Sequence, residues 1–152
     1  MPLSRNFSCF VLALVVSVMP SLAGAAAPAG HFSFTSGAEV VLDTKTGRTW
    51  QRFAGTTTAT WNDANAYCSS VVGATLGGTG WRLPTVKELL SLVDYSVATG
   101  PMIDTAAFPS APADRFWSAN VDIALLPGYV DFGTGRTGPD PRTASHLVRC
   151  VR

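Results

Sequence analysis

The feature that most constrains this chain is the placement of its three cysteines, Cys9, Cys68 and Cys150. Cys9 lies at the start of an apolar N-terminal stretch, whereas the other two lie in mixed sequence. If that stretch is removed by export, an even pair remains, and such a pair most economically forms one disulfide. A Cys68–Cys150 bridge would close a loop of about 80 residues and stabilise the fold by about 4 kcal/mol. The competing interpretation is two buried free thiols.

Residues 1–25 have the features of a cleaved signal peptide. Arg5 supplies a basic start, residues 7–19 form an unbroken apolar run, and residues 23–25 supply the small side chains for cleavage after Ala25. Cleavage after Ala23 is the nearby alternative. The apolar run has about 13 residues, whereas a spanning helix needs about 20, so we expect cleavage and not an uncleaved anchor. This predicts export to the periplasm, cell surface or extracellular space, without a membrane span in the mature chain.

Without the leader the chain is neutral in formal charge. Loss of Arg5 reduces the 11 basic residues to ten, which equals the ten acidic residues. A neutral balance gives no compositional reason to expect nucleic acid or acidic membranes as partners. The roughly 127 remaining residues suit one domain. We expect a flexible lead-in at residues 26–30 and the domain itself over residues 31–152.

The residue pattern predicts strands, then two helices, then strands. Thr60 has the position of a helix N-cap, and Trp61, Ala64, Cys68 and Val71 recur at helical spacing before Gly73, where we expect that helix to end. The capping-box sequence Thr85–Glu88 begins a second helix. The expected strands are residues 32–34, 40–42, 49–51, 116–118, 129–132 and 147–151, and the expected long loops are residues 73–80, 96–114 and 133–141. This order indicates an α+β fold with a small mixed or antiparallel sheet.

Arrangements typical of enzymes are missing from the sequence. Only His31 and His146 are available as imidazole bases, and Ser118 has no Gly-x-Ser-x-Gly surroundings. No zinc motif or phosphate-binding loop occurs, so we expect no catalytic residue, metal or cofactor. Four loop aspartates are candidate calcium ligands without the usual alternating spacing, and the alternative is that they are solvated or cap helix ends. They are Asp94, Asp104, Asp114 and Asp122.

A series of short motifs spans the chain after the leader. They are Gly37–Trp50, Thr60–Cys68, Trp81–Tyr95, Pro101–Pro109, Phe116–Ser118, Val130–Gly135 and Val148–Arg152. In this order they resemble the DUF1566 family, the domain at the C-terminus of the Legionella collagen-like adhesin. The resemblance implies a secreted or surface domain that recognises sulfated glycosaminoglycans and forms trimers. The Trp81–Glu88 segment is also similar to formylglycine-generating-enzyme-like domains, which implies a C-type-lectin-like fold.

Five basic residues to which we assign no structural role are the candidate ligand-binding residues. Arg115, Arg136 and Arg142 lie on or beside the late loops, and Lys45 and Arg48 flank the first turn. Guanidinium groups bind sulfate or carboxylate through a fork of N–H donors, although each residue has ordinary solvation as its alternative.

The remaining arginines and the tryptophans are expected to have structural roles. We expect Arg82 to pair with Glu88 or Asp94. We expect Arg149, which is next to Cys150 on the last predicted strand, and the final Arg152 to face away from the cystine, towards solvent, a salt bridge or a partner. The four tryptophans, Trp50, Trp61, Trp81 and Trp117, should fill the core around the cystine.

These features together predict a non-enzymatic binding module for a glycan or a surface protein, with an oligomer possible. The alternative is a protein-interaction or structural component of a bacterial envelope or appendage assembly.

Overall fold

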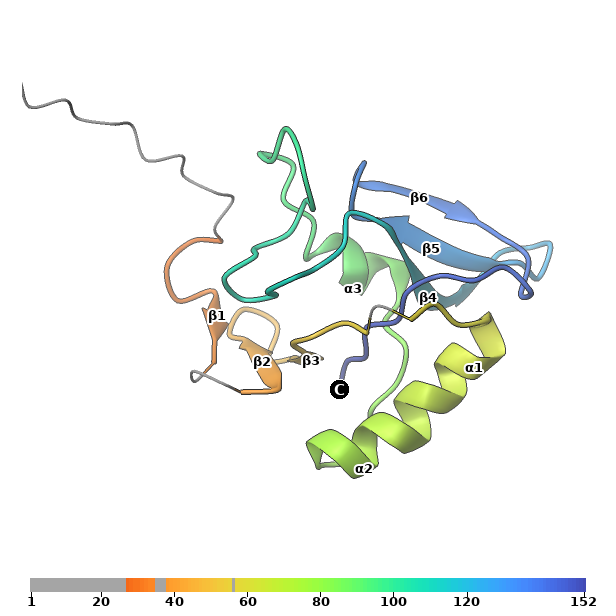
Figure 1. Cartoon of the computed structure of the whole chain (residues 1–152), viewed down its shortest axis with the longest axis horizontal. Coiled ribbons are helices and arrows are strands. Elements are labelled where there is room, and N and C mark those ends of the chain that lie inside the picture. The colour runs from red at the N-terminus through yellow and green to blue at the C-terminus, as the bar shows by residue number, and fades with distance from the viewer. Residues whose placement is uncertain (1–26, 35–37, 56) are drawn as a thin grey trace, which may run out of the picture.

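The computed structural model describes residues 27–34, 38–55 and 57–152, so the expected signal peptide lies outside the described residues. Two three-stranded antiparallel sheets and one long helix make up this part of the chain (Figure 1). The prediction of an α+β fold is therefore confirmed, but in place of the one small mixed or antiparallel sheet that was predicted the chain forms two antiparallel sheets. Within the described ranges, no helix is long and apolar enough to cross a membrane.

The first sheet consists of β1 (Phe32–Ser33), β2 (Val40–Asp43) and β3 (Thr49–Gln51), in that order. Its tight β2–β3 turn forms because Asp43 Oδ1 accepts the backbone N–H groups of Lys45 and Thr46, at 2.9 and 3.2 Å. The end of the chain extends this sheet. Thr49 and Arg152 exchange two backbone hydrogen bonds of 2.9 Å, so the C-terminus lies in the middle of the molecule (Figure 1).

The second sheet consists of β4 (Arg115–Val121), β5 (Pro127–Asp131) and β6 (Arg136–Pro139). The prediction of a loop over residues 133–141, which rested on their turn-like composition, is wrong because residues 136–139 form β6. Gly138 belongs in this strand for a packing reason. A Cβ at Gly138 would lie 2.9 Å from the Tyr129 hydroxyl, so only glycine lets the Tyr129 ring pass over the neighbouring strand.

The long helix is continuous through α1 (Trp61–Ala66), the π-helical η1 (Tyr67–Val72) and α2 (Gly73–Leu76). Thr60 caps it as predicted, accepting the N–H of Asp63. The predicted end before Gly73 is wrong, since the helix ends at Gly77, whose φ of 70° suits glycine.

The π turn also changes which side chains of the helix are buried. Val71, predicted on the buried face, is 51% exposed, whereas Val72 is 1% exposed. A π turn holds more residues than an α turn, which shifts the buried face by one position.

The short helix α3 (Val86–Leu90) follows Thr85, and both hydrogen bonds of the predicted capping box are present. Beyond α3, residues 91–114 form no regular helix or strand but supply much of the larger core. This larger of the two hydrophobic cores contains Ile103 and Phe108 from that segment and Leu89 from α3. Trp50 and other side chains of both sheets complete it. The helix ends at Leu90, and the chain turns at residues 91–92.

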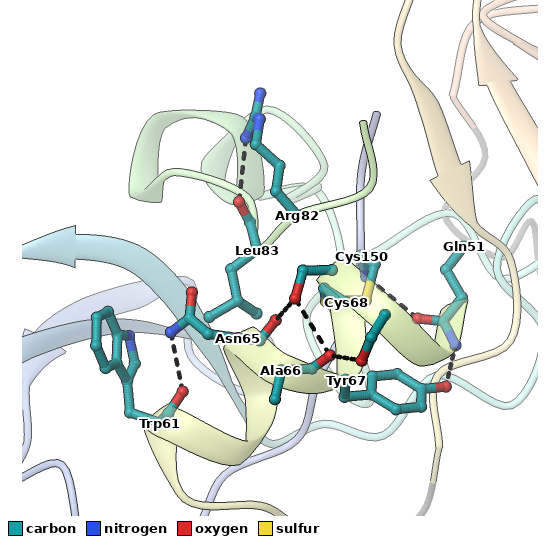
Figure 2. The surroundings of a disulfide bond; sticks show 11 residues. Gln51, Trp61, Asn65, Ala66, Tyr67, Cys68, Arg82, Leu83 and Cys150 are labelled. Atoms are coloured by element: carbon teal, nitrogen blue, oxygen red, sulfur yellow. Dashed lines mark hydrogen bonds between the residues drawn. A yellow bond between two sulfur atoms is a disulfide. The ribbon is translucent and has the colours of Figure 1, made fainter. Parts of the chain in front are cut away.

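The predicted disulfide between Cys68 and Cys150 is confirmed, with Cα atoms 5.5 Å apart. Gln51 reinforces this link between the helix and the C-terminal segment (Figure 2). Its side-chain oxygen accepts the N–H of Cys150 at 3.2 Å, and its amide donates to Tyr67 Oη at 3.0 Å. Trp81 and Trp117 are buried in this cystine core, Trp61 packs against it partly buried, and Trp50 belongs to the larger core instead.

The C-terminal segment differs most from its prediction. Residues 147–151 form isolated bridges and not a strand, because their partners change along the segment: Leu147 pairs with Phe116, whereas Val151 pairs with Trp50 and Arg82. The expectation that Arg149 faces outward is therefore wrong.

Arg149 is instead 0% exposed. Its Nη1 donates to the carbonyl oxygens of Gln51 and Arg52, both at 2.8 Å, and its guanidinium lies 4.6 Å from the ring centroid of Phe108. Burial lowers the pKa of Arg149 to about 9, because desolvation penalises the charged form.

Candidate ligand-binding surface

One face of the second sheet carries a row of charged side chains. Arg115 on β4 lies opposite Asp131 on β5, and Asp131 lies opposite Arg136 on β6. Directly paired residues of antiparallel strands project from the same face, so the two arginines lie on either side of one carboxylate. Phe116, which follows Arg115 on β4, and Val130, which precedes Asp131 on β5, point to the opposite face. Both are buried in the larger core.

Tyr129 forms an aromatic platform beside this charged row. It is paired with Trp117 and Gly138 and is only partly buried. The Arg115 guanidinium lies 4.6 Å from the centroid of its ring. Tyr129 was not among the predicted site residues, although its two-residue spacing from Asp131 on one strand places both side chains on the same face.

The Arg142 and Trp61 pair continues the surface towards the start of the long helix. The Arg142 guanidinium lies 4.1 Å from the centroid of the Trp61 ring, and the indole Nε1 donates to the carbonyl oxygen of Ser118 at 2.8 Å. That hydrogen bond fixes the ring next to β4. Trp61 therefore combines the structural role predicted for it with a partly exposed aromatic face.

Asp140 connects Arg115 to His146. Its Oδ2 accepts Arg115 Nη1 at 3.1 Å and contacts His146 Nε2 at 2.9 Å. His146 is almost fully buried, and its ring packs 4.2 Å from Trp117 and 5.3 Å from Tyr129, between centroids. A buried imidazole thus supports the platform from below, while the carboxylate orients Arg115.

We call this set of residues the arginine surface. It comprises Trp61, Arg115, Tyr129, Asp131, Arg136, Asp140 and Arg142. Three of the five predicted ligand-binding residues, Arg115, Arg136 and Arg142, lie on it. Two carboxylates offset part of the positive charge, and among the described residues no ion pair engages Arg136 or Arg142.

The structure places the other two predicted residues elsewhere, at the β2–β3 turn. Lys45 is exposed there, and Arg48 Nε donates to Glu88 Oε1 at 2.7 Å. The five predicted residues therefore do not form one site. Arg82 reaches the same carboxylate as Arg48, at 2.8 and 2.9 Å, which agrees with the expected Arg82–Glu88 pair.

The four candidate calcium ligands stabilise turns. In each of them the carboxylate Oδ1 accepts hydrogen bonds from nearby backbone N–H groups, as Asp104 Oδ1 does from Ala106 and Ala107. The same holds for Asp94 with Ser96, Asp114 with Arg115 and Asp122 with Ala124 and Leu126. Across residues 27–34, 38–55 and 57–152, no group of three or more His, Cys, Asp or Glu side chains is arranged to hold a metal.

Comparison with known proteins identifies a family for this architecture. A family model described as the Lcl C-terminal domain matches residues 39–152, which is most of the chain and includes the whole arginine surface. No curated protein and no solved structure matches the chain. The C-type-lectin-like fold therefore remains a prediction.

Proposed function

Because the chain belongs to the Lcl C-terminal domain family, we propose that it is an adhesin-type, non-enzymatic binding module that recognises acidic glycans outside the cell. The family describes an adhesin-like domain. The finer assignment, a glycan with acidic groups, is supported by the composition of the arginine surface.

The observation that carries this proposal is the combination of arginines and aromatic rings on one surface, to which the second sheet, the segment after β6 and the start of α1 contribute. Tyr129 and Trp61 are partly exposed aromatic residues, against which the apolar face of a sugar ring can pack. Arg136 and Arg142 lie beside those rings and retain donors for the carboxylate or sulfate groups of an acidic glycan.

The carboxylates of Asp131 and Asp140 also have a role in this proposal. They hold Arg115 at 3.9 and 3.1 Å and lower the net positive charge of the surface. A surface of mixed sign attracts a polyanion less than a purely basic one does. We therefore expect recognition to depend on sugar structure as well as charge, with a weaker salt dependence than simple ion exchange.

The proposal is tested with the oxidised mature domain on immobilised heparin, hyaluronate and neutral dextran. We expect retention on at least one acidic glycan and none on dextran. The double substitution Arg136→Ala/Arg142→Ala should abolish retention. Lys45→Ala/Lys87→Ala removes the same charge from other elements and serves as the matched control, which should lose much less retention than the arginine variant.

Two results would contradict the proposal. One is passage of the wild-type domain through every acidic glycan column at low salt. The other is equal loss of retention in both double variants, which would indicate attraction by net charge alone.

A second candidate function, docking to a protein of an envelope assembly, is favoured by the tip of the β4–β5 hairpin. Ile123 and Leu125 are fully and 68% exposed there, respectively. The tip is held in shape by Asp122, whose Oδ1 accepts the N–H groups of Ala124 and Leu126 at 2.8 and 2.9 Å. Leu125 adopts a φ of 61°, an unfavourable conformation for a residue with a side chain.

This second function predicts that a fixed partner co-purifies with the domain from envelope fractions. Ile123→Ser/Leu125→Ser should release that partner without affecting glycan retention. Absence of any stoichiometric partner, or the same partner on the variant, would exclude the hairpin tip as its docking site.

A further inference from the structure

We infer that Arg48, Glu88 and Arg82 form a second binding site, which takes an oxyanion group of the sulfate, phosphate or carboxylate class. We call these three residues the Arg48–Glu88–Arg82 cluster. The cluster shares no residue with the arginine surface, so this inference does not depend on the proposed function.

The two guanidinium groups converge on a single oxygen atom. Arg48 Nε lies 2.7 Å from Glu88 Oε1, and Arg82 Nη2 lies 2.8 Å from the same oxygen. Arg82 Nη1 donates in addition to Glu88 Oε2 at 2.9 Å. Because both groups contact one atom, they must lie side by side, although they come from positions 34 residues apart in the sequence.

Glu88 is committed to its present partners. Besides the two arginines, its Oε2 accepts the backbone N–H of Thr85 at 2.7 Å and the Thr85 hydroxyl at 3.1 Å. The hydrogen bond from Arg82, together with those from Thr85 and Arg48, holds the pKa of Glu88 far below its usual range. The carboxylate therefore stays ionised at neutral pH and keeps both guanidinium groups in place.

The cluster carries more positive than negative charge and is open to solvent. Two guanidinium groups share one carboxylate, and their side chains are 38% and 49% exposed, whereas that of Glu88 is 8% exposed. Lys87 and Lys45 are exposed on the same two elements, α3 and the β2–β3 turn. The single negative charge of Glu88 therefore does not neutralise the two arginines, and the cluster attracts anions.

The guanidinium group of Arg48 has N–H donors that are available to a bound anion. In the described part of the chain, no hydrogen bond engages Arg48 Nη1 or Nη2. A guanidinium fork whose Nε is already fixed loses little further freedom when it binds, so most of the ordering cost of a ligand contact is met in advance. A planar fork of this kind matches the oxygen spacing of sulfate, phosphate and carboxylate groups.

The test follows the guanidinium Nε–H signals of the oxidised mature domain by NMR. Sodium sulfate, phosphate and acetate are titrated separately at constant ionic strength, with chloride as the balancing ion. We expect a saturable shift of the Arg48 and Arg82 signals at millimolar concentrations of at least one oxyanion. The order of affinity among the three identifies the group that natural ligands carry.

Two variants make the test specific. Arg48→Lys keeps the charge but removes the fork, and should weaken the apparent affinity at least fivefold, while Arg136→Ala/Arg142→Ala should leave it unchanged. The inference is overturned if none of the three oxyanions gives a saturable shift, or if Arg48→Lys binds as tightly as the wild type. Loss of glycan retention with an intact oxyanion response would separate failure of the proposed function from failure of this site.

Discussion

Arginine is held in two different ways in this domain, in the larger core and on the arginine surface. In the core, Arg149 donates to two backbone oxygens and lies against Phe108 with no carboxylate partner among the described residues. On the surface, Arg136 and Arg142 remain partly or fully exposed, next to aromatic rings and carboxylates. The difference shows that burial, and not residue type, decides whether an arginine supports the fold or is free to bind a ligand.

The largest expected effect comes from breaking the cystine beside Arg149. Replacing Cys68 and Cys150 by alanine opens a loop with a sequence separation of 82, which should lower the free energy of unfolding by about 4 kcal/mol. Urea denaturation of the oxidised wild type and the double variant measures this. A loss below about 1 kcal/mol would mean that hydrophobic packing holds the C-terminal segment without the bond.

Removal of the buried guanidinium should have the next largest effect. Arg149→Ala leaves a cavity and two backbone carbonyl oxygens without their donor, and should cost about 3 kcal/mol of stability. Arg149→Met restores much of the volume and separates packing from hydrogen bonding. If Arg149→Ala unfolds at the same urea concentration as the wild type, the core role assigned to Arg149 is wrong.

An intermediate effect is expected at Glu88, which is buried but paired with half-exposed arginines. Its folded-state pKa is depressed, so its stabilisation is complete above the unfolded value of about 4.3 and is lost as pH falls into the acid range. Glu88→Gln should cost about 1 kcal/mol at pH 7, a value reduced for solvent screening of the arginines. Thermal unfolding between pH 2 and pH 7 should then show a flatter acid limb in the variant; parallel curves would argue against this pairing.

The smallest effect on stability is expected on the arginine surface. Arg136→Ala/Arg142→Ala should change the free energy of unfolding by less than about 0.5 kcal/mol, while removing glycan retention. Calorimetry and column retention on one preparation give both numbers. A large loss of stability would place these arginines with Arg149 as structural residues and would remove the contrast between the two regions.

Local features of the fold were predictable from the sequence, and features that depend on distant contacts were not. The two threonine caps and the cystine follow from short patterns and cysteine pairing. The burial of Arg149 was missed because residues 147–151 take different partners at each end, so the alternation of a strand does not apply. Strand β6 was missed because Gly138 is typical of a turn. Its place in the strand depends on the ring of Tyr129, which packs over it from the neighbouring strand.

The candidate site was predicted only in part for the same reason. Arg115, Arg136 and Arg142 were selected for their chemistry. The sheet register brings Arg115 and Arg136 to one face, and Arg142 is placed by its contact with the Trp61 ring. Tyr129 and Asp140 were not selected, because their value comes from side-chain contacts with Arg115 that only the folded chain brings about. Lys45 and Arg48 were grouped with the others by residue type and lie on a different part of the fold.

The central claim is that acidic glycans bind at the arginine surface, and its most direct test is an NMR titration of the labelled domain with a heparin oligosaccharide. We predict that the backbone signals of Tyr129, Arg136 and Thr137 and the indole signal of Trp61 shift together and saturate. The buried indole of Trp50, in the larger core, should not move. Binding that saturates while the signals of Tyr129, Arg136, Thr137 and Trp61 stay in place would contradict the account.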